Sequence, residues 1–134
     1  MTWTTVLDAS AAGTWTLGDR TVNRVGLGAM RLTGTAAFDI GGRRDRDTSI
    51  AVLRRAVELG VDTAAFYFSP WLSANQLIHA ALAPYDDHLT LVTKVGPGRD
   101  PSGEWMTWAG PEQLRGQVEQ NLRELGRDHL DVVN

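Results

Sequence analysis

The sequence predicts an α/β protein in which parallel strands are covered by helices. Continuous apolar runs, typical of strands buried on both faces, alternate along the chain with amphipathic helical stretches. A short hairpin comes first, and the order is then strand, helix, strand, helix, strand, helix, strand. Two architectures fit this order, the doubly wound sheet and the eight-stranded (β/α)8 barrel, and periodicity alone does not separate them.

The N-terminal part of the chain is expected to form a hairpin and the first parallel strand. Residues 14–25 are two β-prone runs around a Gly18-Asp19 turn. Residues 25–30 form a compact apolar run with glycines, which is typical of a buried strand. A loop follows to about Asp47.

Three helices and three further strands are expected after this loop. The first helix begins at Asp47, where acidic and hydroxyl residues can cap it, and Gly60 ends it. We treat residues 1–134 as a single incomplete domain, with the hairpin followed by four strands and three helices in 25–134. The remaining elements are a strand at 61–67, a helix at 74–85, a strand at 89–95, a long loop at 96–110, a helix at 111–126 and a strand at 129–134.

Composition excludes several classes of partner. The net charge is −3, from 13 basic and 16 acidic residues that are interspersed along the chain, which argues against nucleic acid or an anionic membrane. We see no signal peptide and no segment long enough to cross a bilayer, so we expect a soluble, cytoplasmic protein. Cysteine is absent, and the three histidines have no zinc-site spacing, so we expect no metal.

The glycine motifs do not indicate a nucleotide-binding fingerprint. Gly26 and Gly28 begin like a dinucleotide motif, but Arg31 takes the place of the third glycine and no amphipathic helix follows directly. Gly96 and Gly98 lack the lysine and hydroxyl residue of a phosphate-binding loop. A structural role in a strand end remains an alternative for Gly26 and Gly28.

Asp62, Tyr67 and Lys94 are the candidate catalytic residues. Tyr67 ends one predicted strand and Lys94 lies near the end of the next, and sites of parallel β/α proteins are built at these ends. A free tyrosine has a pKa of about 10, and a nearby ammonium group eases proton donation to a developing alkoxide. The alternative is a structural salt bridge between Asp62 and Lys94, with Tyr67 on the rim.

Several stretches resemble, in order, the N-terminal half of an aldo-keto reductase, over about residues 14–134. The five-residue step from Asp62 to Tyr67 and the later strand lysine are the specific parts. The matching stretches are Val25–Leu32, Gly60–Ala64, Tyr67, Thr93–Val95, Pro111–Leu114 and Asn121–Asp131.

This resemblance implies a (β/α)8 barrel of TIM type, closed at its bottom by the hairpin, of which this chain provides the first four strands. It implies an oxidoreductase that uses NADPH to reduce a small aldehyde or ketone, with Tyr67 as the acid and with Lys94 and Asp62 tuning it. Ala29 and Met30, together with Asp62, are expected near the nicotinamide. A complete barrel needs about 250 residues, so we expect weak or no activity from these 134 residues alone.

Other residues are expected to shape the substrate pocket. Asn134 stands where many family members have a histidine, and Phe68 where a glycine commonly follows the tyrosine. Trp71, Trp105 and Trp108 are expected in loops at the same face and suit an aromatic wall, although packing against the rim is equally open.

A second hypothesis is a non-catalytic half barrel that pairs with a second copy or with a missing C-terminal half. It follows from the open apolar edge expected at Asp131, Val132 and Val133.

Overall fold

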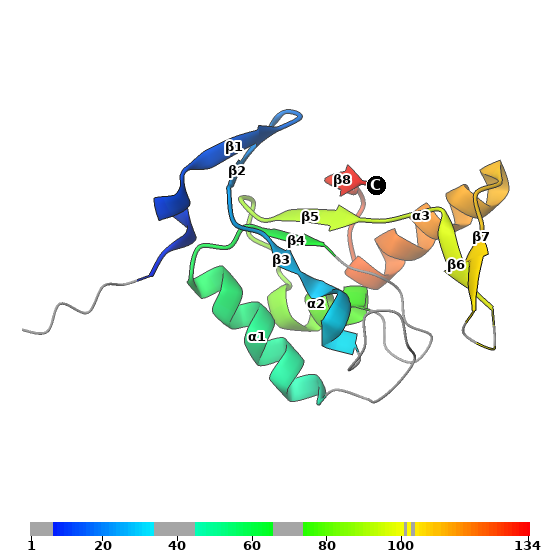
Figure 1. Ribbon diagram of the computed structural model, residues 1–134, viewed down its shortest axis with the longest axis horizontal. Coiled ribbons are helices and arrows are strands. Elements are labelled where there is room, and N and C mark those ends of the chain that lie inside the picture. Colours follow the sequence, from blue (N-terminus) through cyan, green and yellow to red (C-terminus); the bar gives the residue numbers. More distant parts are fainter. Residues whose placement is uncertain (1–6, 34–44, 66–73, 101, 103) are drawn as a thin grey trace, which may run out of the picture.

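The computed structural model describes residues 7–33, 45–65, 74–100, 102 and 104–134, and Figure 1 gives the element labels. Its central feature is a four-stranded parallel sheet made of β3, β4, β5 and β8. These strands span Leu27–Gly28, Thr63–Ala65, Thr90–Thr93 and Val132–Val133.

The strands lie in the sheet in the order in which they occur in the sequence. In a doubly wound sheet the order in which strands are added reverses after the first strands, whereas in a barrel each strand is added beside the previous one. The strand order therefore favours the barrel over its competitor. The β/α alternation and the parallel pairing predicted from the sequence are confirmed.

Within the described residues, three α-helices connect the strands. They are α1 (Arg46–Glu58), α2 (Ala74–Leu82) and α3 (Pro111–Leu125). Helix α1 begins one residue before the predicted Asp47, because the Asp45 carboxylate accepts the Thr48 backbone amide at 3.0 Å and satisfies an unpaired helix donor. Gly126 ends α3 in the left-handed conformation at φ 65°, as the sequence predicts.

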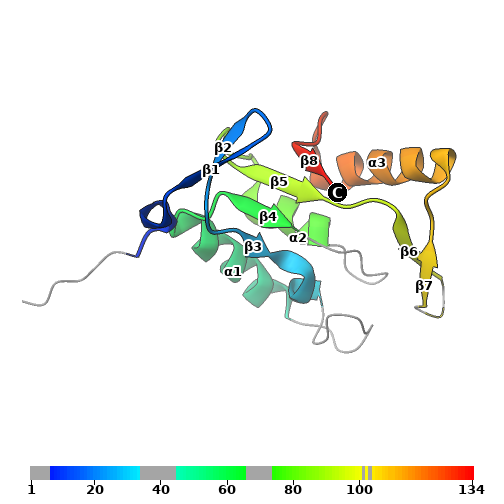
Figure 2. The ribbon, with the colours of Figure 1, turned by 45° about the horizontal axis from the view of Figure 1, so that its top comes forward.

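The core lies between the sheet and the helices. Figures 1 and 2 show α1 and α2 along one side of the sheet. Leu53 of α1, Leu77 and Ile78 of α2, Leu91 of β5 and Leu125 of α3 are all at most 2% exposed, and they belong to one apolar cluster. Because this cluster occupies the helix side, the opposite face of the sheet is the one that faces the barrel interior.

A hairpin lies at the N-terminal ends of the parallel strands, as predicted. It consists of β1 (Thr14–Leu17) and β2 (Arg20–Asn23), with Gly18 at φ 63° in the turn. A short 3-10 helix, η1 (Ala9–Ala12), precedes it, and a second one, η2 (Ala29–Thr33), directly follows β3. The first strand is thus shorter than predicted.

The segment predicted as a long loop at 96–110 contains a second hairpin. Its strands are β6 (Pro97–Arg99) and β7 (Trp105–Thr107), paired antiparallel. Both views show it extending beyond the C-terminal end of β5 (Figures 1 and 2). Glycine and proline at 96–98 favoured a loop, but the backbone pairing overrides that local preference. In the part of the chain that the structure describes, no helix has the length and apolar character of a membrane span.

Candidate active site at the C-terminal strand ends

Lys94 and Asn134 lie side by side at the C-terminal edge of the sheet. The Asn134 backbone amide donates to the Thr93 backbone carbonyl at 2.9 Å, and the Val95 backbone amide donates to the Asn134 backbone carbonyl at 2.9 Å. Because Thr93 pairs with Val133, the next residues on both strands share a level and a face. Lys94 is partly exposed and Asn134 is exposed, so both side chains can meet a ligand above the sheet.

Tyr67, Phe68 and Trp71 lie outside the described residues. Tyr67 is two positions after Ala65, the last residue of β4, and Lys94 directly follows Thr93, the last residue of β5. The two strands are neighbours in the sheet.

Asp62 lies at the opposite end of the sheet from Lys94. Its carboxylate accepts the Asn23 amide at 2.8 and 3.1 Å, which fastens the first hairpin to the start of β4. The Asp62 carbonyl accepts the Thr90 amide, so Asp62 lies level with the start of β5 and roughly 16 Å of strand separates that level from Lys94. The Asp62 side chain thus lies just before β4, and its predicted pairing with Lys94 stays a prediction.

Ala29 and Met30 follow the C-terminal end of β3, but only one of them faces outward. Ala29 is fully buried in the core cluster, and its predicted place near a cofactor stays a prediction. Met30 is partly exposed. At Gly28 the space where a Cβ would point is open, so a ligand can approach the backbone there.

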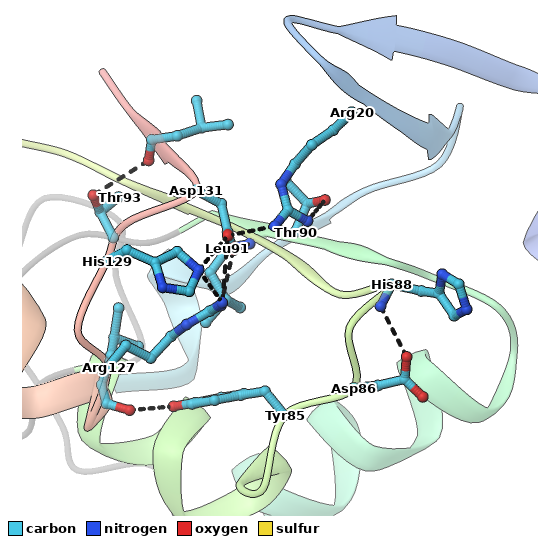
Figure 3. Close-up of polar contacts among 12 residues, drawn as sticks. Arg20, Tyr85, Asp86, His88, Thr90, Leu91, Thr93, Arg127, His129 and Asp131 are labelled. Atoms are coloured by element: carbon cyan, nitrogen blue, oxygen red, sulfur yellow. Dashed lines mark hydrogen bonds and ion pairs between the residues drawn. The ribbon is translucent and has the colours of Figure 1, made fainter.

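Asp131, expected on the open edge, is instead a fully buried carboxylate at the N-terminal end of the sheet (Figure 3). It pairs with Arg20 at 2.7 Å and with Arg127 at 2.8 Å, and it accepts the Leu91 amide at 2.9 Å. Arg20 also donates to the Thr90 hydroxyl at 3.3 Å. Asp62 and Asp131 thus fasten the first hairpin beneath the barrel, away from the C-terminal edge.

Trp105 and Trp108 stand on or beside the β6–β7 hairpin, at the same end of the sheet as Lys94. Trp105, Met106 and Trp108 are 40 to 43% exposed. A hollow of about 490 Å³ lies against the hairpin. Its lining residues are Gly96, Pro97, Trp105, Met106, Thr107 and Ala109.

Sequence reasoning missed the role of Gln117 on α3. Its side-chain oxygen accepts the Gly96 amide and its nitrogen donates to the Trp108 carbonyl, both at 2.7 Å. The available signal was the spacing of Gln113, Gln117 and Asn121, one amide per helical turn, on a helix whose polar face otherwise reads as solvated. Among the described residues, no cluster of histidine and acidic side chains suits a metal ion.

The strand order, the helix layer on one face and the exposed polar edge define the first part of a (β/α) barrel. Comparison with known proteins then gives the family. A family model described as "Aldo/keto reductase family" matches residues 24–134, and the chain belongs to this family of oxidoreductases.

Curated relatives support the same assignment. A pyridoxine 4-dehydrogenase of Escherichia coli K12 is 48% identical over 127 residues, which cover 92% of this chain and 43% of the relative. An uncharacterized oxidoreductase of Schizosaccharomyces pombe is 41% identical over 129 residues, which cover 94% of this chain and 40% of the relative. The chain therefore spans about two fifths of the length of these relatives.

Solved structures confirm the barrel fold. A putative aldo-keto reductase from Pseudomonas aeruginosa superimposes with a TM-score of 0.75 at 20% identity, covering 98% of this chain and 49% of that one. A glycerol dehydrogenase from Gluconobacter oxydans gives a TM-score of 0.71 at 22% identity, covering 92% of this chain and 38% of that one. The fold class predicted from the sequence, the N-terminal half of a TIM-type barrel, is confirmed.

Proposed function

We propose that this chain forms the catalytic half of an NADPH-dependent carbonyl reductase. The observation that carries the proposal is the position of Lys94, partly exposed at the C-terminal end of β5, beside the strand whose continuation leads to Tyr67. In β/α barrels this edge is where catalytic residues gather. Asp62 stays in the proposed catalytic group as the sequence predicts, with its carboxylate also accepting the Asn23 backbone amide at the start of β4.

Tyr67 is the proposed proton donor. Its hydroxyl donates a proton to the carbonyl oxygen as negative charge develops there, and the Lys94 ammonium stabilises the tyrosinate that remains. The Asn134 amide, beside Lys94, orients the carbonyl by a hydrogen bond but cannot act as an acid. When bound, NADPH supplies the hydride that adds to the carbonyl carbon.

The described residues suit the nicotinamide end of the cofactor. Met30 offers a partly exposed side chain after β3, and the open space at Gly28 admits a flat ring against the backbone. Phosphate groups in such barrels are bound by loops after the seventh and eighth strands, so the preference for NADPH over NADH is set outside these four strands.

For the substrate we propose a small aromatic aldehyde of the pyridoxal type. The support is the 48% identity to a protein named pyridoxine 4-dehydrogenase, together with the exposed tryptophans of the β6–β7 hairpin. A flat pyridine ring matches an indole surface through offset stacking. Trp105 and Trp108 are the candidates for this wall, and Trp71 remains a proposal from sequence.

The first test is a titration of the chain with NADPH, following quenching of its five tryptophans. Saturable binding, followed by NADPH oxidation on addition of pyridoxal, supports the proposal. Tyr67→Phe should then abolish turnover and leave cofactor binding intact. Absence of saturable binding at millimolar NADPH contradicts a cofactor site within this chain.

A second candidate is a half barrel that works only after pairing with further strands. Its support is the sheet itself, in which β3 and β8 are the outer strands and the exposed Val133 lies on β8. A closed barrel has no edge strands, so the completing strands come from a second copy or from a C-terminal half. Sizing with mass detection tests self-pairing, which a strictly monomeric, well-folded chain contradicts.

A further inference from the structure

Helix α3 carries three side-chain amides at four-residue intervals, which places them on one face of the helix. Each of them bonds to the backbone of the segment that connects β5 to α3. The Asn121 nitrogen donates to the Lys94 carbonyl at 3.4 Å, the Gln117 amide bonds to Gly96 and Trp108, and the Gln113 oxygen accepts the Gly110 amide at 3.0 Å.

Gln117 bridges the two ends of the β6–β7 hairpin. Gly96 directly precedes β6 and Trp108 directly follows β7, so one side chain holds both strands to α3. The Trp108 amide also donates to the Gly96 carbonyl at 2.7 Å, which closes the base of the hairpin. A hairpin of two three-residue strands is marginal by itself, so its position depends on this attachment.

The same attachment fixes an indole ring. A Cβ built on Gly98 would lie 2.6 Å from the Trp108 ring, so the ring packs directly on the Gly98 backbone. Trp105 and Met106 remain 40% and 43% exposed on the other strand. Gln117 therefore determines where this apolar surface stands relative to Lys94, which is two residues before Gly96.

We propose that Gln117 is a positioning residue that sets substrate specificity, by fixing the β6–β7 hairpin so that its tryptophans form one wall for an aromatic carbonyl substrate. The inference rests on the proposed reductase function. It goes beyond that function by assigning specificity to a residue on a helix, whose side chain need not contact the substrate.

The attachment is tested first by hydrogen exchange of the chain. Gln117→Ala removes both bonds, and the Gly96 and Trp108 amides should exchange about tenfold faster. Gln120→Ala is the matched control, because Gln120 lies on the same helix and bonds only to Glu124 among the described residues. Unchanged exchange at both amides in Gln117→Ala overturns the proposal.

A conservative variant separates the two bonds. Gln117→Glu keeps an oxygen that accepts the Gly96 amide but loses the donor to the Trp108 carbonyl. Its Gly96 amide should remain protected while the β7 side of the hairpin loosens. Equal loss of protection in the Glu and Ala variants would indicate general damage to α3 and would count against the proposal.

Specificity is tested by steady-state kinetics with pyridine-4-carbaldehyde and propanal. In Gln117→Ala the KM for the aromatic aldehyde should rise about three- to tenfold, the range of one lost aromatic contact, while kcat stays within about twofold. The KM for propanal should not change. Gly98→Ala, which displaces the Trp108 ring without touching Gln117, should reproduce this pattern.

The two arms separate the possible failures. Faster exchange with an equal change for both aldehydes overturns the specificity role. If neither aldehyde is reduced even after the unmutated chain is combined with the strands that complete the barrel, the proposed function fails and the specificity role with it. Hydrogen exchange still decides in that case whether Gln117 holds the hairpin.

Discussion

Removing the charge of Asp131 should destabilise the fold strongly without touching the C-terminal edge. The carboxylate has no exposed surface and holds Arg20 of the first hairpin, Arg127 after α3, and the Leu91 amide of β5. Asp131→Asn keeps the shape but leaves two guanidinium groups without their counter-charge. Their side chains are 28% and 14% exposed, so water recovers only part of the loss.

The size of the effect follows from these contacts. Removing one partner of a buried ion pair costs about 3 to 5 kcal/mol, and we take about 3 kcal/mol because both arginines retain some solvent. At about 2.1 cal/mol/K per residue, 134 residues have an unfolding entropy of about 0.28 kcal/mol/K. We therefore expect Tm to fall by about 10 °C.

The assay is thermal unfolding followed by circular dichroism at 222 nm, with Asp128→Asn as the control. Asp128 is three residues away, has a 95% exposed side chain and contacts His129. The control should unfold with the unmutated chain. An Asp131→Asn variant that also unfolds with the unmutated chain would refute the claim that this carboxylate holds the hairpin to the sheet.

Three further predictions concern other parts of the chain. Burial raises the pKa of Tyr85 to about 12, against the opposing effect of Arg127. The protonated Tyr85 hydroxyl therefore stabilises the fold fully below pH 10, and this stabilisation is lost as the pH rises through about 12. In a spectroscopic titration of tyrosinate at 295 nm, the component that titrates late should disappear in Tyr85→Phe. Titration of Tyr85 near pH 10 would contradict the raised pKa. Gly60→Ala should lower the free energy of unfolding by about 1 to 2 kcal/mol or more, because φ at Gly60 is 79° and the new Cβ would lie 2.8 Å from the Asp8 carboxylate. Urea unfolding measures this change, and an unchanged midpoint would show that the turn tolerates a side chain. Lys94→Met should lower kcat for NADPH-dependent reduction by about a hundredfold or more, and full activity would remove Lys94 from the mechanism.

The sequence predicted the elements well where the signal is local. Helix α3 begins at Pro111 and ends before Gly126, because proline suits the first turn and glycine the left-handed cap. Helix α1 begins one position before the predicted Asp47, because Asp45 caps it from outside the apolar repeat. The hairpin of β6 and β7 was not predicted, because glycines flank Pro97 and because neither strand carries an alternating apolar pattern.

The candidate site divides in the same way. The sequence by itself determined the parallel α/β class, the place of Lys94 at the end of a buried strand and the family resemblance, because each depends on residue order along the chain. Only the tertiary structure decided that Asp62 and Asp131 hold the first hairpin beneath the barrel and that Gln117 holds the second hairpin above it. These contacts join residues that are 39, 111, 21 and 9 positions apart, and periodicity does not reveal the level at which neighbouring strands align.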